Sequence, residues 1–394
     1  MSQETEYSRT YTIHNCHVHL FTIDYIPRNF LSRWFPVTLA KKKWIANLAY
    51  KLLKNRLNRY SAFFYSSLKK SHEDVLEELS AYYPRSAKFV PLSVDFDYMQ
   101  AGDPIHPFEK QLKDLAQLKE KYPDKIYPFI GVDPRREDIA ALVKEYIEDR
   151  GFSGIKLYPA LGFFPDDDRL DPVYEYAQEY QIPITTHCIP KNQNHYRGKI
   201  TDEMKEKASE IPGYSKRQAR RAYDFAMYLN HPYWYYKVVN RYPGLKINLA
   251  HFGGNEEWDR YLDEPYRPPE ELQQRARSLG EEEKRVEIPD GGRWATMSWY
   301  SWIRELIKQA ENVYADISFT VYDDRLYPVL KNLVKSTNVK NRILFGSDFY
   351  MLQKDYRERR FGIDVRGYLD DEDYWLIAED NPRRFLTNTI RNGY

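Results

Sequence analysis

His17 and His19 lie two positions apart in a short apolar stretch near the start of the chain. In a β-strand, residues i and i+2 point to the same face, so both imidazoles would face one point. Paired imidazoles are a donor set that suits Zn²⁺ or a similar divalent ion. A His-x-His pair alone is a weak signal, because chance or packing often produces one.

Further side chains of this kind stand at the ends of later apolar stretches: His187, His251 and Asp348, with Lys156 and Asp316 near the ends of two more. Each has an ordinary interpretation by itself. His251 could be a hydrogen-bonded core histidine, Asp348 a helix cap, and Lys156 an ion-pair partner. Four of the nine histidines occupy such ends, which chance explains poorly. We therefore predict that these side chains come together at one site with the first two histidines.

Short apolar stretches alternate with amphipathic helical patterns along the whole chain. Eight stretches could form strands: 11–20, 88–94, 126–132, 154–158, 182–188, 245–252, 313–318 and 343–348. Helical patterns lie between them, at 108–121, 136–149, 172–180, 232–241, 299–311 and 326–335. This alternation predicts an α/β fold, a (β/α)8 barrel of the TIM type, in which the C-terminal ends of the strands carry the active site.

Three long insertions, helical or irregular, interrupt this alternation at about 21–86, 191–231 and 253–295. Each follows the end of a predicted strand, so all three belong to the face where barrel enzymes build their sites. We find no boundary for a second domain and expect residues 1–394 to form one. The helical pattern at 33–57 could serve a homodimer.

The composition excludes several classes of function. The 59 basic and 58 acidic residues give a formal net charge of +1, which does not favour nucleic-acid binding. Two cysteines make no disulfide framework, and no run of about 18 apolar residues predicts a membrane span. The polar N-terminus has no apolar core of a secretory signal. We expect a cytoplasmic protein whose partner is a small-molecule substrate.

Seven motifs strengthen the prediction, because they follow one another across almost the whole chain. They are HNCHVHLF (14–21), GIKLYP (154–159), PITTHC (183–188), HPYW…YPGLKINLAHFGG (231–254), NVYADIS (312–318), RILFGSD (342–348) and NPRRFL (381–386). As a set they resemble the amidohydrolase superfamily and, within it, the amidohydrolase-related branch often called amidohydrolase 2. The insertion at 253–295 departs from the simplest members.

The resemblance implies roles for the candidate residues. His17 and His19 would bind the tighter metal together with Asp348, and His187 would complete the shell or bind a second ion. The ion would be Zn²⁺ or another divalent metal such as Mn²⁺. His251 would be a second-metal ligand or a substrate-facing acid or base.

Lys156 matches a lysine that is carboxylated and bridges two metals in binuclear members of the superfamily. In mononuclear members of this branch that role is absent. The resemblance therefore leaves open whether the chain binds one ion or two.

Three functions fit these residues. The first is a hydrolase that opens an amide, lactone or ester bond with a metal-activated water, whose proton Asp348 accepts. The second is a non-oxidative decarboxylase of an aromatic or unsaturated carboxylic acid, in which Arg135 and Arg136 could bind the carboxylate. Both arginines could equally begin a solvated helix. The third is a non-catalytic binding protein with a vestigial site.

Overall fold

Each of the eight apolar stretches contains a β-strand in the computed structural model, which describes residues 11–30, 69–191, 194–263, 286–349 and 358–390. The strands are β1 (His14–Val18), β2 (Lys88–Pro91), β3 (Phe129–Val132), β4 (Gly154–Leu157), β5 (Ile184–His187), β6 (Ile247–Ala250), β7 (Val313–Asp316) and β8 (Ile343–Leu344). The strands are shorter than the apolar stretches. The apolar residues that flank them are buried as well but do not belong to the strands.

All strand pairs are parallel, and the pairing follows the order of the chain. β1 pairs with β2, and β3 to β8 form one six-stranded sheet. Two isolated bridges, between Phe89 and Ile126 and between Leu92 and Phe129, join the two sheets on one side. On the other side, the amide of Cys16 donates to the carbonyl oxygen of Phe345 at 2.9 Å. A few backbone hydrogen bonds outside the assigned strand ladders thus connect the two sheets at both junctions, in the order expected of a (β/α)8 barrel.

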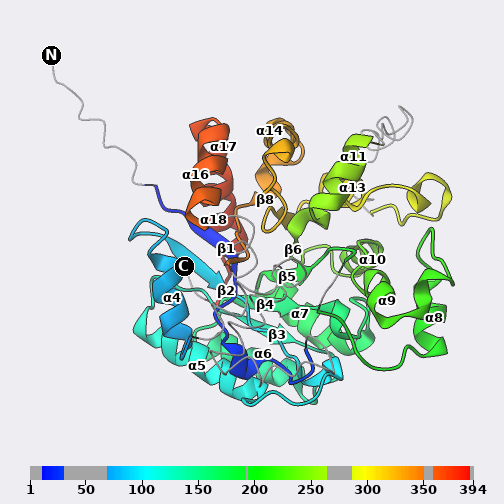
Figure 1. The fold of residues 1–394 in the computed structure, drawn as a ribbon, viewed down its shortest axis with the longest axis horizontal. Coiled ribbons are helices and arrows are strands. Elements are labelled where there is room, and N and C mark those ends of the chain that lie inside the picture. The colour runs from blue at the N-terminus through cyan, green and yellow to red at the C-terminus, as the bar shows by residue number, and fades with distance from the viewer. Residues whose placement is uncertain (1–10, 31–68, 192–193, 264–285, 350–357, 391–394) are drawn as a thin grey trace, which may run out of the picture.

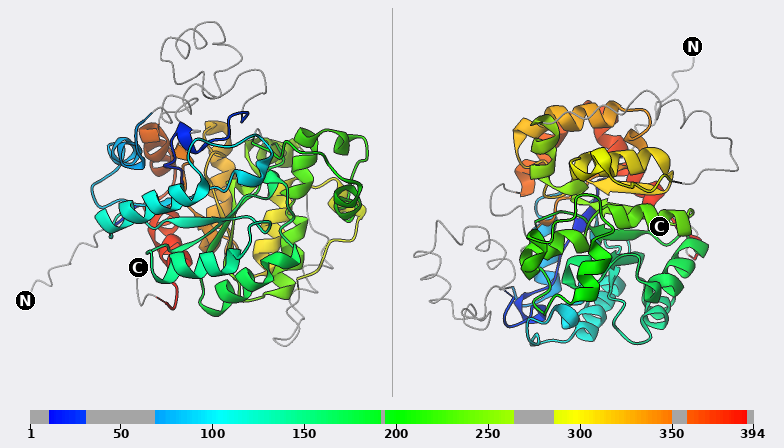
Figure 2. Two further views of the ribbon diagram at one scale, coloured as in Figure 1. Left: turned by 90° about the horizontal axis from the view of Figure 1, so that it is seen from below. Right: turned by 90° about the vertical axis from the view of Figure 1, so that its right-hand side faces the viewer.

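Helices surround this ring (Figure 1). They are α4 (His72–Ser80), α5 (Phe108–Lys121), α6 (Ile139–Glu148), α7 (Asp171–Glu179), α8 (Asp202–Ala208), α9 (Ala222–Leu229), α10 (Tyr233–Arg241), α11 (Asn255–Asp263), α13 (Trp299–Gln309), α14 (Tyr327–Lys335), α16 (Glu358–Tyr368), α17 (Asp371–Trp375) and α18 (Asn381–Leu386). In the right view of Figure 2, the yellow to red helices lie on one side of the strands and the cyan to green helices on the other. Of the six predicted helices, the one at 108–121 has the predicted bounds, and the others differ by one to three residues at an end.

The late start of α6 has a local cause. The sequence predicts a helix from Arg136, but the amide of Arg136 donates to the carbonyl oxygen of Asp133 in a turn. Asp138 then adopts a left-handed conformation with φ of 51°, which a helix does not accommodate. The helix therefore begins at Ile139.

Apolar side chains form two layers. The larger cluster fills the space between the strands and the helices. A smaller cluster joins side chains from β1, β2, β3, β7 and β8, which lie around the ring, so it must fill the barrel interior; it contains Cys16, Val90, Leu92, Tyr127, Phe129, Tyr314, Leu344, Phe385 and Leu386. Phe385 and Leu386 belong to α18, which therefore packs against this interior layer. The metal-binding candidates occupy the other end of the strands.

A bulge in β1 determines which of its side chains face the interior. Asn15 pairs with Phe89 and Val18 with Pro91, so Cys16 and His17 both lie opposite the single residue between those partners. Two residues opposite one define a β-bulge, which redirects side chains and is common beside active sites. Because of it, Cys16 and His17 both face the interior, whereas strict alternation would give His17 the same outward direction as Asn15.

The insertions contain elements of their own in the described residues. The insertion at 21–86 contributes α4, the insertion at 191–231 contributes α8 and α9, and the insertion at 253–295 contributes α11. The helical pattern predicted at 33–57 lies outside the described residues. Among the helices of the described part of the chain, none combines the length and apolar character that a membrane crossing requires.

Candidate metal centre

His17 and His19 each have one ring nitrogen anchored inside the protein. Nδ1 of His17 is 3.1 Å from Oδ2 of Asp316, and Nδ1 of His19 is 2.9 Å from the carbonyl oxygen of Leu92. Both partners accept, so each Nδ1 carries the proton and each Nε2 keeps its lone pair. Nε2 of His17 is buried without a hydrogen-bond partner among the described residues. Orientation of a histidine through its other nitrogen is the usual arrangement of a metal ligand.

Asp348 joins these two histidines. Its Oδ1 is 3.7 Å from Nε2 of His19 and has no hydrogen-bond partner in the described part of the chain. One ligand atom from each of His17, His19 and Asp348 lies within 4.8 Å of the other two. The site therefore holds three donors that suit a divalent ion, two of them preset as neutral imidazoles.

The backbone at Asp348 explains how a residue so far beyond its strand reaches the site. Asp348 follows the end of β8 by four residues and adopts a left-handed conformation, with φ of 57°. Its amide donates to the carbonyl oxygen of His17 at 2.8 Å, which fixes one candidate ligand against another. His251, with φ of 65°, is left-handed as well. Such conformations are uncommon outside glycine and cluster at functional sites.

His187 and His251 form a chain of hydrogen bonds beside the three donors. Nδ1 of His251 lies 3.0 Å from the carbonyl oxygen of Ser318, so this nitrogen carries the proton. Its Nε2 then accepts from Nδ1 of His187 at 3.0 Å, which leaves the lone pair on Nε2 of His187. His187 lies outside the 4.8 Å group of donors, but its ring is presented as a ligand would be.

Burial keeps the histidines of the site neutral. It lowers the pKa of His17 and lowers the pKa of His19 well below 6.5. Burial likewise lowers the pKa of His251 to about 3. Burial works to raise the pKa of Asp316, but the electrostatic effect of His17 and the hydrogen bond from it outweigh burial and hold that pKa below its usual value. Neutral imidazole is the form that binds metal.

Lys156 lies in β4 with a relative exposure of 1%, and its Nζ has no hydrogen-bond partner among the described residues. The ammonium is 5.9 Å from the centre of the Tyr158 ring. Burial lowers the pKa of Lys156 to about 8, against the opposing effects of Asp316 and Asp348. Burial in turn raises the pKa of Asp348 to about 7, with Lys156 acting against that rise. Lys156 therefore belongs to the electrostatics of the site.

A second group of donors consists of His17, His251 and Asp316. The carboxylate oxygens of Asp316 and the ring nitrogens of His251 in this group are already engaged in hydrogen bonds. Oδ2 of Asp316 accepts from His17 and, at 2.7 Å, from Asn248, and its Oδ1 accepts from the amides of His251 and Ser318. Within this group only Nε2 of His17 keeps an imidazole lone pair, and that nitrogen already belongs to the first set of donors. The group therefore orients the candidate ligands and offers no further imidazole nitrogen for a second ion.

The sequence did not indicate three residues that support the site. The hydroxyl of Ser318 contacts Asp316 in β7, His17 in β1 and His251 directly after β6, so it links three segments of the site. The side-chain amide of Asn248 donates a hydrogen bond to Oδ2 of Asp316. Gly346 packs so closely against His17 that an added Cβ would lie 2.9 Å from Cβ of His17. A single polar or small residue within an apolar stretch carries no distinctive sequence signal.

Arg135 and Arg136 belong to internal ion pairs. Arg135 makes a two-pronged contact with Asp133, at 2.8 and 2.6 Å. Arg136 pairs with Asp95 at 2.7 Å and with Asp97 and Glu109 at 2.6 Å each. Carboxylates of the chain thus already occupy both guanidinium groups, so the structure does not favour them as the binding site for a substrate carboxylate.

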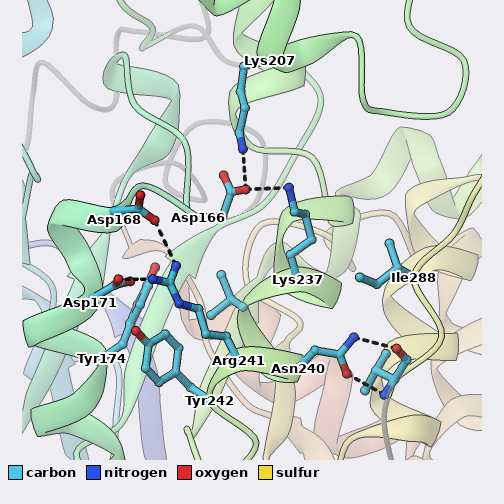
Figure 3. Close-up of a pocket in the computed structure, with 12 residues that line it drawn as sticks. Asp166, Asp168, Asp171, Tyr174, Lys207, Lys237, Asn240, Arg241, Tyr242 and Ile288 are labelled. Carbon is cyan, nitrogen blue, oxygen red and sulfur yellow. Dashed lines mark hydrogen bonds and ion pairs between the residues drawn. The ribbon is translucent and has the colours of Figure 1, made fainter.

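A cavity of about 690 Å³ lies elsewhere, between α7 and α10 (Figure 3). Its cations are paired within the chain: Lys207 and Lys237 contact Asp166 at 2.8 and 3.0 Å, and Arg241 contacts Asp168 at 3.1 Å. None of the candidate metal ligands lines it. This cavity is separate from the metal centre.

The family model described as Amidohydrolase matches residues 16–272 and 287–387 of the chain. The chain therefore belongs to the amidohydrolase family and is an enzyme of this metal-dependent class. No curated protein sequence matches the chain.

Solved structures with the same fold include enzymes of two reaction types. A 5-carboxyvanillate decarboxylase from Sphingomonas paucimobilis is 12% identical, with a TM-score of 0.53 over 96% of this chain and 99% of that chain. A dihydroxybenzoic acid decarboxylase from a Polaromonas species, with bound manganese and the inhibitor 2-nitroresorcinol, is 13% identical, with a TM-score of 0.51 over 96% and 97%. A probable 2-pyrone-4,6-dicarboxylic acid hydrolase from Acinetobacter baumannii, with citric acid bound, is 11% identical, with a TM-score of 0.50 over 95% and 98%.

Proposed function

We propose that the chain is a mononuclear metal-dependent hydrolase that opens a lactone, ester or amide bond in a small carboxylic acid. The observation that carries this proposal is the convergence of His17, His19 and Asp348 on one point, with both imidazoles held as neutral donors. His187 is the fourth ligand in this proposal. The engagement of His251 and Asp316 in hydrogen bonds supports a single ion.

The donor set of imidazoles and one carboxylate accepts Zn²⁺ and Mn²⁺. Such an ion acts as a Lewis acid and lowers the pKa of water toward about 7. Asp348 is the proposed base, because its Oδ1 faces the same point as the ligand atoms and can accept the proton of the attacking water. Asp348 then returns that proton to the leaving group.

His251 is the proposed positioning residue of His187. Its two ring nitrogens are engaged by Ser318 and His187, so it fixes which nitrogen of His187 faces the site. This differs from a direct contact with substrate, which the sequence-based hypothesis allowed for His251.

Decarboxylation of an aromatic acid is the second candidate. One observation favours it: the ring of Tyr158 lies 4.2 Å, centre to centre, from the ring of His187, and so offers an aromatic wall beside the proposed ligands. Aromatic side chains bind aromatic ligands by offset or edge contacts. Two of the structures with the same fold are named as decarboxylases of aromatic acids.

The experiment that tests the proposal combines metal loading with two product assays. Protein loaded with Zn²⁺ or Mn²⁺ would be incubated with 2-pyrone-4,6-dicarboxylate and further lactones, and separately with dihydroxybenzoates and 5-carboxyvanillate. Ring opening without CO2 release is the expected result. CO2 release would assign the decarboxylase instead.

A matched pair of variants locates the reaction in this site. Asp348→Asn should lower kcat by about 10²–10⁴-fold, the usual contribution of a general base. Asp323→Asn, at the partly buried N-cap of a short helix, should have no effect. Wild-type protein that binds no metal and is inactive with every divalent ion would contradict the proposal and favour a non-catalytic binding protein.

A further inference from the structure

Lys156 has no assigned partner in the mononuclear site. Its Nζ is buried and makes no hydrogen bond to any described residue. Burial of a lone charge is costly unless a partner of opposite charge or several hydrogen bonds compensate. A partner from outside the chain would remove this cost.

The acids that share a small cavity with Lys156 are already neutralised. Asp95 and Asp133 line that cavity together with Lys156. Asp95 is held by Arg136 and Asp133 by Arg135, in contacts of 2.7 and 2.6 Å. Among the residues that line this cavity, the positive charge of Lys156 therefore has no carboxylate of its own.

The charges that do act on Lys156 come from the metal centre. Asp316 and Asp348 are the groups whose electrostatic effect reaches its ammonium, and neither forms a salt bridge with it. A divalent ion and one ammonium facing these two carboxylates leave a net charge of about one positive unit. One anionic group of a substrate would balance the site.

We propose that Lys156 is an unmodified ammonium that binds a carboxylate group of the substrate beside the metal ion. This inference rests on the proposed function, because it uses the same site and a single ion. Carboxylated lysine would instead bring a further negative charge and require a second ion, for which His251 and Asp316 have no free donor atoms. Lys156 is thus the residue that selects carboxylic acids over their neutral analogues.

The test compares ligands that differ only in charge, on protein loaded with Mn²⁺. Isothermal titration calorimetry would measure binding of 2,6-dihydroxybenzoate, phthalate and citrate, each against its neutral amide. The wild type should prefer the carboxylates. Lys156→Met, which keeps a similar length, should weaken carboxylate binding by about 30-fold or more and leave amide binding unchanged. Metal content should remain one ion per chain.

Two further variants make the result specific to the charge at this position. Lys156→Arg retains a cation and should keep the preference for carboxylates. If Lys156→Met does not fold, Lys156→Arg still tests whether a cation at this position sets the preference. Lys144→Met, on the exposed face of α6, should behave as wild type. Circular dichroism and the melting temperature would establish folding of each variant.

Several results would overturn the inference. Equal loss of carboxylate and amide binding in Lys156→Met would indicate a structural role, and a wild type without any preference would remove the premise. A carbamate signal in ¹³C NMR after incubation with labelled bicarbonate, together with two ions per chain, would identify a bridging lysine. Absence of metal uptake contradicts the proposed function as well, whereas metal uptake without a carboxylate preference contradicts this inference alone.

Discussion

Asp316 decides which nitrogen of His17 carries a proton. Its Oδ2 accepts from Nδ1 of His17 and from Asn248, so the lone pair of Nε2 stays directed at the candidate metal. A carboxylate in this position also makes the imidazole a stronger donor. Metal affinity should therefore depend on a residue that does not itself bind the ion.

Replacement of Asp316 by asparagine tests this dependence. The amide of Asn can present a donor to Nδ1 and so favour the wrong tautomer, and metal affinity should fall by about 10–100-fold. Competition with a chelator would measure the affinity, with Asp323→Asn as the control. An affinity equal to that of wild type would mean that Asp316 does not orient His17.

The sequence predicted which side chains would lie together where several signals agreed. His17 and His19 stand two apart at a strand end, and Asp348 ends another apolar stretch, so their convergence followed from the barrel topology. Ser318 was missed, because one serine among apolar residues is unremarkable. Its role depends on tertiary contacts with Asp316 and His251 that no local pattern encodes.

At the scale of elements, β1 packs closely against Gly346, which follows β8. The close approach to His17 leaves no room for a side chain at this position, since an added Cβ would lie 2.9 Å from Cβ of His17. The bulge in β1 gives His17 its inward direction at the same place. The geometry of this candidate ligand thus depends on the segment that follows β8 as well as on β1.

Gly346→Ala should therefore impair both stability and metal binding. Overpacking of a buried position costs about 1–3 kcal/mol, and the displaced imidazole should bind metal more weakly. Gly362→Ala in α16 is the matched control, because an added Cβ there would meet no described atom within 4 Å and alanine favours helix by up to about 1 kcal/mol. Chemical denaturation would measure the stability of both variants. A Gly346→Ala protein as stable as wild type would contradict the close fit.

The order and type of the elements were predictable, and their details were not. Alternation of apolar stretches with helical patterns gave eight strands in the right places. The bulge at Cys16 and His17 was not predictable, because it depends on the register against β2. The start of α6 differs because the ion pairs and turn after β3 override the helical pattern from Arg136.

For the whole molecule, buried neutral histidines outside the metal centre should make stability depend on pH. Burial lowers the pKa of His72 to about 4 and that of His231 to about 3. Nδ1 of His231 also accepts the amide of Tyr233 at 3.1 Å, which requires the unprotonated nitrogen. In the unfolded chain these groups take up protons near pH 6.5, well before they do so in the folded protein.

The sign of the effect follows. Because the folded pKa values are depressed, stability is complete above about pH 6.5 and falls as the pH decreases toward 3, by about 1.4 kcal/mol per pH unit for each such histidine. His231→Asn can still accept the amide but cannot titrate. This variant should be less stable at pH 7, through lost packing against Trp299 and Trp302, and show a shallower decline between pH 6 and 4. An unchanged slope would show that His231 does not contribute.

The fold of the whole molecule brings segments more than 300 residues apart in the chain to one candidate metal centre, and a crystal structure of protein soaked with Mn²⁺ tests this centre most directly. Anomalous scattering would locate the ion without reference to the surrounding atoms. We predict one ion per chain, bonded to Nε2 of His17, Nε2 of His19 and an oxygen of Asp348. An ion bound elsewhere, or two ions bridged by Lys156, would contradict a mononuclear centre at this position.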